Sequence, residues 1–226
     1  MNSEVVPLAD ILCEQHRDQV LRLECPSTVG MLETLRCCRS CGARAERERQ
    51  RGTGRLQAAC ELASLLSPQQ ARQQCATYEA ARAVAAYHYG GRVCEVALEE
   101  HPRGRQIRAW TRWDATPLLP EQAATVHLVG LVATDWWLIQ HKHHGQRYQI
   151  AARWSAIDDV VAARDYVGRD GILSALQRSA VLWARLRTGM CCVAERLDHC
   201  GHLEEQQFLA SVRKTALHSR VDRHAV

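Results

Sequence analysis

The chain has 226 residues, 46% of them hydrophobic and 24% charged, so it can bury a sizeable core, which excludes a wholly disordered protein. Its net charge of +4 permits a nucleic-acid partner but does not require one. Arginine supplies 27 of the 29 basic residues, a bias that phosphate recognition or a GC-rich genome would each produce.

The N-terminal third is expected to be helical. Apolar residues recur at helical spacing over residues 4–24, and Pro26 lies beyond the end of this segment. A second helical pattern runs from residue 43 to about residue 66, with two glycines near its middle. We therefore assign residues 1–66 to a first, helical region.

A helix and an antiparallel sheet are expected in the middle region, residues 67–154. Ser67 and Pro68 are favourable first residues of a helix, and two glycines after residue 89 mark its end. Beyond it, alternating or continuous apolar runs predict four or five strands. The candidate strands cover residues 93–98, 107–113, 126–132, 136–141 and 147–154.

The last region, residues 155–226, is expected to form a helical bundle. Ser155 is followed three residues later by Asp158, a pattern typical of a helix start. Residues 172–186 have the apolar spacing of an amphipathic helix. The predicted fold class is α+β, with N-terminal helices and a zinc knuckle, a central antiparallel sheet and a C-terminal helical bundle.

Eleven cysteines make metal binding the first chemistry to consider. The sequence shows no N-terminal signal peptide and no run of about 18 apolar residues, so we expect a cytoplasmic protein without a membrane span. In that reducing compartment, clustered cysteines bind metal more often than they form disulfides.

The strongest metal-binding signal is the pair Cys38 and Cys41, whose C-x-x-C spacing lets two thiolates bind one ion. A structural zinc ion takes four ligands, usually as two close pairs, so Zn²⁺ is the expected cofactor of this knuckle. A further group of zinc-compatible residues, from Cys191 to His202, has a spacing unlike that of standard fingers. The second pair of the knuckle is left open between two candidates: Cys13 with His16, or Cys25 with Cys37.

Arginines follow the knuckle closely. Arginine makes bidentate contacts to phosphates and bases, and a zinc knuckle that runs into an arginine-rich segment is a common nucleic-acid-binding surface. We therefore expect DNA or RNA to be the partner. A protein-interaction adaptor with structural cysteines is an alternative of a different class. The candidate nucleic-acid-binding residues, the last two on the predicted sheet, are Arg44, Arg47, Arg51, Arg147 and Arg153.

The segment from Arg36 to Arg47 resembles the Cys-and-Arg segment near the start of some rolling-circle replication initiators. The resemblance implies a metal-binding histidine pair on a strand, to which the segment around His127 is similar, and a nucleophilic tyrosine on a later helix, to which the segment around Tyr166 is similar. It therefore implies a nickase with Tyr166 as nucleophile. Val129 stands where the second histidine is usual, which favours a non-catalytic protein.

The predicted order of parts is similar to that of the small zinc-containing large subunits of plasmid-borne RNA-guided (CRISPR-type) complexes. This resemblance implies other protein subunits as partners beside the nucleic acid. Both resemblances imply a protein of a phage or plasmid. The leading expectation is a zinc-stabilised, arginine-rich, non-catalytic nucleic-acid-binding protein, either a regulator or a subunit of a nucleoprotein complex.

Overall fold

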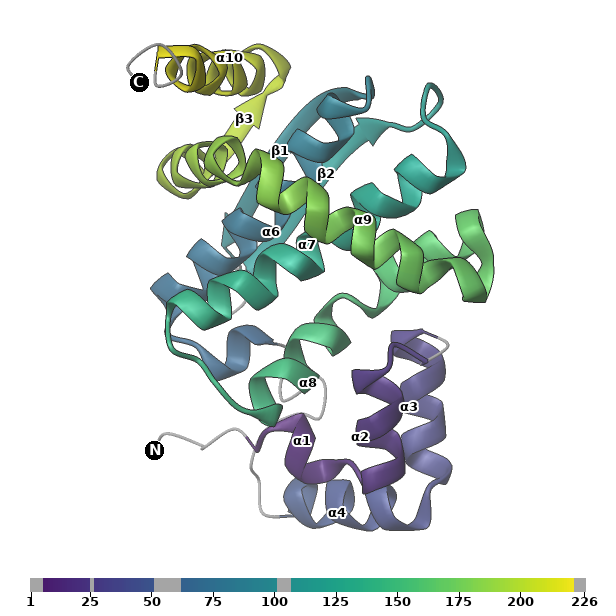
Figure 1. Ribbon diagram of the computed structural model, residues 1–226. Helices are drawn as coiled ribbons and strands as arrows, with labels where there is room; N and C mark the ends of the chain where they lie inside the picture. The colour runs from purple at the N-terminus through teal and green to yellow at the C-terminus, as the bar shows by residue number, and fades with distance from the viewer. Residues whose placement is uncertain (1–5, 25–26, 51–61, 101–106, 222–226) are drawn as a thin grey trace.

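The computed structural model describes residues 6–24, 27–50, 62–100 and 107–221 and confirms the predicted α+β class (Figure 1). Helices dominate, and one antiparallel sheet lies in the body of the molecule. In chain order the elements are α1 (Leu8–Ile11), α2 (Glu14–Leu21), α3 (Thr28–Cys37), α4 (Arg39–Gln50), the 3₁₀ turn η1 (Leu62–Leu65), α6 (Pro68–His88), β1 (Arg92–Glu100), β2 (Ile107–Asp114), α7 (Pro120–Gln140), α8 (Gln146–Ser155), α9 (Ile157–Cys200), β3 (His202–Glu204) and α10 (Glu205–Val221).

The sheet has the strand order β2-β1-β3, and β1 pairs antiparallel with both neighbours. Strands β1 and β2 are consecutive in the sequence, whereas β3 is added from the C-terminal end of α9. A β-bulge between Val93 and Glu95 shifts the register of β1 against β2. One face of the sheet packs against α6, because Val93 and Val96 belong to the same buried cluster as the alanines of that helix.

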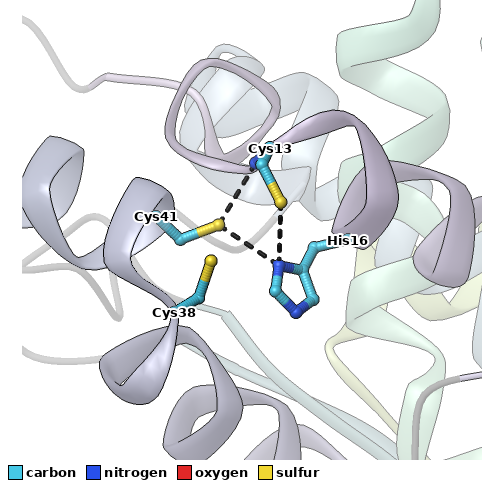
Figure 2. Close-up of side chains that lie close together, drawn as sticks. All are labelled: Cys13, His16, Cys38 and Cys41. Atoms are coloured by element: carbon cyan, nitrogen blue, oxygen red, sulfur yellow. Dashed lines mark hydrogen bonds between the residues drawn. The ribbon is translucent and has the colours of Figure 1, made fainter.

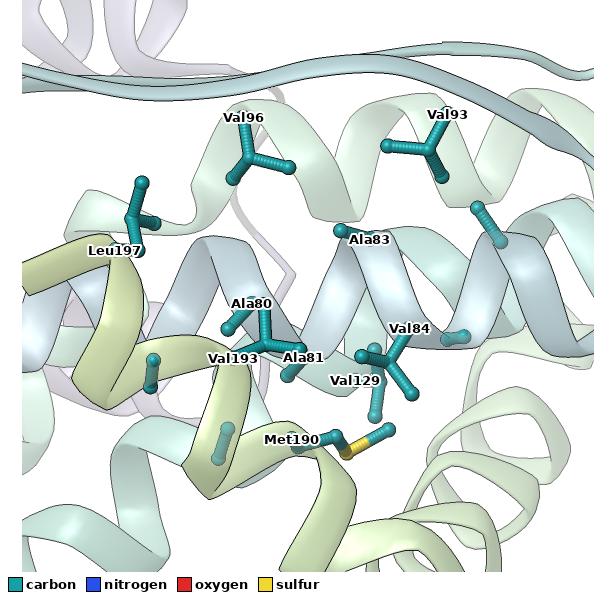
Figure 3. Close-up of a cluster of buried hydrophobic side chains, with 14 of the residues drawn as sticks. Ala80, Ala81, Ala83, Val84, Val93, Val96, Val129, Met190, Val193 and Leu197 are labelled. Atoms are coloured by element: carbon teal, nitrogen blue, oxygen red, sulfur yellow. The ribbon is translucent and has the colours of Figure 1, made fainter. Parts of the chain in front are cut away.

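Helix α6 is the centre of the body and lies between the sheet and the pair α7 and α9 (Figure 3). Its start was predicted correctly: Ser67 and Gln70 form a reciprocal capping box. Its small side chains let neighbours approach on several sides, as a helix buried nearly all round requires. The fully buried alanines of α6 include Ala76, Ala80, Ala81, Ala83, Ala85 and Ala86.

The three strands predicted within residues 126–154 are wrong, because this stretch forms α7 and α8. A continuous apolar run fits a buried strand and a buried helix equally well, and periodicity does not separate them. Helix α7 is buried on most of its surface between α6 and α9, which explains the run. Pro120 at its first turn was the available helix signal.

The C-terminal region is helical, as predicted. Helix α9 changes direction at Gly168, which has φ 71° and ψ 173°, and then continues to Cys200. Gly201, with φ 73°, ends it in the left-handed conformation that glycine adopts readily. Among the described residues, no helix is long and apolar enough to cross a membrane.

The first four helices form a separate small cluster below the body in Figure 1, which we call the N-terminal module (residues 8–50). It has its own buried apolar residues, separate from those around α6. The module rests on α8, because Ile150 and Trp154 from α8 complete its core. The other members of this core are Leu8, Ala9, Leu12, Val20, Met31, Leu35, Cys41 and Ile157.

Gly130 of α7 should resist replacement by alanine. A Cβ atom at this position would lie 2.8–2.9 Å from ring atoms of Tyr78, whose hydroxyl is held by a hydrogen bond to Asp159. We expect Gly130→Ala to lower the free energy of unfolding by about 1–3 kcal/mol, the usual range for overpacking, as measured by urea denaturation. A gain of about 1 kcal/mol, which helix propensity alone predicts, would contradict this packing.

Candidate metal centre

Four potential metal ligands converge in the N-terminal module: Cys13, His16, Cys38 and Cys41 (Figure 2). They come from two short segments, each with two ligands three positions apart at the start of a helix. Cys13 precedes the first residue of α2 and His16 lies in its first turn, while Cys38 and Cys41 occupy the equivalent positions at the start of α4. An i, i+3 pair at a helix start points both side chains to one side, so two such helix starts enclose one centre.

The distances fit a single metal ion. All four ligand atoms lie within 4.8 Å of one another. The Nδ1 atom of His16 lies 3.0 Å from Sγ of Cys13 and 3.3 Å from Sγ of Cys41. A tetrahedral ion about 2.0–2.3 Å from each ligand separates its ligand atoms by about 3.4–3.8 Å, so small side-chain adjustments suffice.

The pKa values of the two thiols of the C-x-x-C pair are shifted in opposite directions. Hydrogen bonding from the backbone N–H of Cys41 lowers the pKa of Cys38. Burial raises the pKa of Cys41 to about 12, although its Sγ accepts a hydrogen bond from the backbone N–H of Cys13 at 3.2 Å. Without a cation, the buried Cys41 thiol therefore keeps its proton. The buried Cys41 thiolate would be stabilised by the positive charge of a bound metal ion, and the thiol proton would be released on binding.

The core of the module covers part of the metal centre. Cys41 is completely buried, and His16 is buried as well. Arg44 donates a hydrogen bond of 3.0 Å to the carbonyl oxygen of Leu12, the residue before Cys13. Arg44 therefore fixes the peptide that carries the first ligand and ties α4 to the end of α1.

The structure decides part of the open question about the second ligand pair. It brings Cys13 and His16 to Cys38 and Cys41, as one of the two candidates required. Cys37 is exposed at the end of α3 and does not belong to the group. Cys25 lies outside the described residues. Of the C-terminal group, Cys191 to His202, no three ligands lie together within the part of the chain that the structure describes.

The proposed nucleic-acid-binding arginines are spread over several environments. Arg47 is exposed on α4 and Arg147 is exposed on α8, whereas Arg51 lies outside the described residues. Arg153 forms a two-point ion pair with Asp135 of α7, at 3.1 and 3.2 Å. Both Arg147 and Arg153 were expected on the sheet, and their helical position corrects that expectation.

Two exposed arginines were not singled out by the sequence reasoning. Arg36, near the end of α3, and Arg39, at the start of α4, are exposed on either side of the half-buried Cys38. Arg39 and Arg47 are both exposed on α4 and lie eight positions apart, which is about 12 Å along the helix axis. Their short spacing from Cys38 was the signal in the sequence that could have identified them.

His127 and Tyr166, the residues of the nickase alternative, do lie together, but on helices rather than on a strand and a helix. Their rings stack with centroids 5.9 Å apart. The Nδ1 atom of His127 lies 2.9 Å from a carboxylate oxygen of Asp159. Within the described residues, His127 belongs to no group of three or more potential metal ligands.

Asp159 is the buried partner that the sequence did not reveal. Its carboxylate also accepts a hydrogen bond from the Tyr78 hydroxyl and pairs with Arg82 at 3.1 Å. Burial alone would raise its pKa, but the hydrogen bond from His127 and the charge of Arg82 hold the pKa of Asp159 below its usual value. Asp159 lies in the first turn of α9, but the expected capping of this helix by Ser155 is wrong: Ser155 is the last residue of α8, and the N-cap of α9 is Ala156.

Comparison with known proteins adds no relative: no family model matches the chain, and neither a curated protein nor a solved structure is significantly similar to it. The metal centre therefore carries the functional argument.

We expect the protein to bind about one transition-metal ion per chain, because the four ligands of the centre suffice for one tetrahedral site. Cys41→Ser should remove the metal and destabilise the N-terminal module, since metal binding and folding are coupled. Elemental analysis and thermal unfolding with and without a chelator measure both effects.

The neighbouring Cys37 gives a matched control, because it is exposed and outside the centre. Cys37→Ser should keep the metal and the thermal stability of the parent. Acidification should release the metal, since protons compete for the three thiolates and affinity falls as pH falls. Equal metal content in the two variants would show that the cluster is not the binding site.

Proposed function

We propose that this chain is a zinc-stabilised, non-catalytic nucleic-acid-binding protein. The observation that carries the proposal is the convergence of Cys13, His16, Cys38 and Cys41 next to exposed arginines on α4. The metal's role is to hold the N-terminal module in one shape. The arginines of that module make the contacts with phosphates.

Zinc is the metal that best suits this set of ligands. Three thiolates and one imidazole form a soft donor set, which disfavours magnesium and calcium. Zinc in structural sites is bound by four protein ligands, and sets of three cysteines and one histidine are among the usual ones. All four positions are filled by protein side chains, which supports a structural rather than a catalytic role.

The surface proposed to bind nucleic acid is the exposed side of α4 and the turn before it, which carries Arg36, Arg39 and Arg47. A rigid helix holds such guanidinium groups at fixed spacing, which lowers the entropy lost on binding a phosphate backbone. Arg44 supports this surface from the inside through its bond to Leu12. We keep DNA and RNA as alternative ligands, and a regulator and a complex subunit as alternative roles, in a phage or plasmid setting.

The nickase remains the second candidate, because Tyr166 and His127 are in ring contact and Tyr166 is 43% exposed. The chemistry needs a divalent metal to polarise the scissile phosphate. His127 offers one ring nitrogen to Asp159, and Val129 is fully buried in the helix core. These features favour the non-catalytic function.

The arginine surface can be tested by a double replacement, Arg39→Ala with Arg47→Ala. We expect weaker binding to labelled DNA or RNA and a salt dependence reduced by about two units of slope, one for each lost phosphate contact. Fluorescence anisotropy over a range of salt concentrations measures both quantities.

The matched control is Arg185→Ala with Arg196→Ala, which removes two exposed arginines from α9. This control should bind like the parent. If the parent itself binds neither DNA nor RNA, the protein-interaction adaptor replaces our proposal. If the two double variants behave alike, the surface lies elsewhere.

A covalent assay separates the two candidate functions. Incubation with labelled single-stranded DNA and Mn²⁺ should give no adduct that survives denaturation, because a lone histidine holds metal poorly. An adduct that forms with the parent and disappears in Tyr166→Phe would establish the nickase instead.

A further inference from the structure

Helix α9 presents to solvent an apolar face that no other part of the described chain covers. Leu173 is 66% exposed and Val181 is 70% exposed, although both are large apolar side chains. They lie eight positions apart, a spacing that returns a residue to the same side of a helix. The exposed residues between and beside them are small or uncharged: Ser174, Gln177, Ala180 and Ala184.

The opposite side of α9 is packed into the body of the molecule. Leu182 and Trp183 belong to the buried cluster around α6. Between residues 171 and 184 the only charged residue is Arg178, whose guanidinium donates hydrogen bonds to Thr125 of α7 and to Ser174. The exposed face is therefore free of other charges over about four turns of the helix.

A charge of opposite sign lies at each end of this face. Asp170 and Arg185 are both exposed, and within the described part of the chain neither forms an ion pair. They lie fifteen positions apart, which is about 22 Å along the helix axis. The midpoint between these two charges and the midpoint between Leu173 and Val181 both fall within one residue of Gln177. Read outwards from Gln177, each half of the face thus has an apolar side chain followed by a charge, and the two charges are opposite.

We infer that a second copy of this chain binds to this face, with the two α9 helices antiparallel about a two-fold axis at Gln177. A two-fold interface uses the same surface on both copies, so that surface must complement itself. Here Leu173 of one copy packs against Val181 of the other, and Asp170 of one copy pairs with Arg185 of the other. The symmetry makes each of these contacts twice.

The positions of the charges select the antiparallel arrangement. A parallel pair of α9 helices would place Asp170 next to Asp170 and Arg185 next to Arg185, and like charges in an interface repel. The face belongs to a single helix, so the interface is small and we expect association in the micromolar range. The inference depends neither on the metal centre nor on nucleic-acid binding.

Sedimentation velocity over a hundredfold range of micromolar concentrations tests the association. The full chain is studied free of nucleic acid and under reducing conditions, because Cys37 and Cys200 are exposed and could cross-link two copies. We expect the mass to rise with concentration from 25.4 kDa towards twice that value. A chain that stays monomeric at every concentration would overturn the inference.

The variant Val181→Glu locates the interface. It should be monomeric throughout the range, because the dimer would bury a carboxylate against Leu173 without a partner. The matched control is Ile139→Glu, the same kind of change at an apolar position of α7 that is 59% exposed, and it should dimerise like the parent. If the two variants dimerise equally, the face on α9 is not the interface.

Charge reversal tests the antiparallel order. Asp170→Arg and Arg185→Asp should each raise the dissociation constant about tenfold or more, because one reversal turns both symmetry-related attractions into repulsions. The double variant should return close to the parent, since the ion pairs form again in the reverse sense. Reversal is used rather than removal, because the loss of an exposed ion pair changes affinity little.

Arg196→Asp, at an exposed position near the C-terminal end of α9, is the control for charge reversal and should dimerise like the parent. Circular dichroism establishes that each variant is folded. A double variant as weak as the two single variants would reject the antiparallel pairing.

Discussion

The close packing of small side chains around α6 is the constraint on which the body of the molecule depends. The helix has to accept the sheet on one side and α7 with α9 on the others, and its buried alanines leave room for all three (Figure 3). Larger residues at Ala80 or Ala83 would force the layers apart, because interiors are packed as densely as organic crystals. The same requirement explains why Gly130 faces the ring of Tyr78.

The N-terminal module cannot rely on packing of that kind. Its helices are short, and its buried cluster is small and borrows residues from α8 and α9. Small units with little apolar core usually need a metal or a disulfide to hold one shape. The centre joins the start of α2 to the start of α4, two segments about 25 residues apart in the chain. A metal ion bound there would therefore hold together two helix starts that are distant in the sequence.

Local sequence signals predicted the ends of elements better than their type. Ser67 and Pro68 marked the true start of α6, because capping depends on a few neighbouring residues. The apolar run of α7 was misread as strands, because its burial between two helices is a property of the whole fold. The sequence did not predict β3, because this short strand follows α9 and pairs with β1, from which it is distant in the chain.

For the metal ligands too, the local spacing was visible in the sequence and the tertiary contacts were not. The C-x-x-C pair was visible at once, and Cys13 with His16 has the same spacing, but their meeting depends on how α1 and α2 fold back onto α4. The charged network around Asp159 was not visible, because its members come from α6, α7 and α9 and share no spacing.

A cavity of about 410 Å³ lies where the N-terminal module, the sheet and the helices of the body meet, and it is linked to that module through the packing between them. Trp154 belongs both to the core of the N-terminal module and to the wall of the cavity. Leu32 of α3 also touches both. The packing of these two residues therefore ties the wall of the cavity to the core of the N-terminal module.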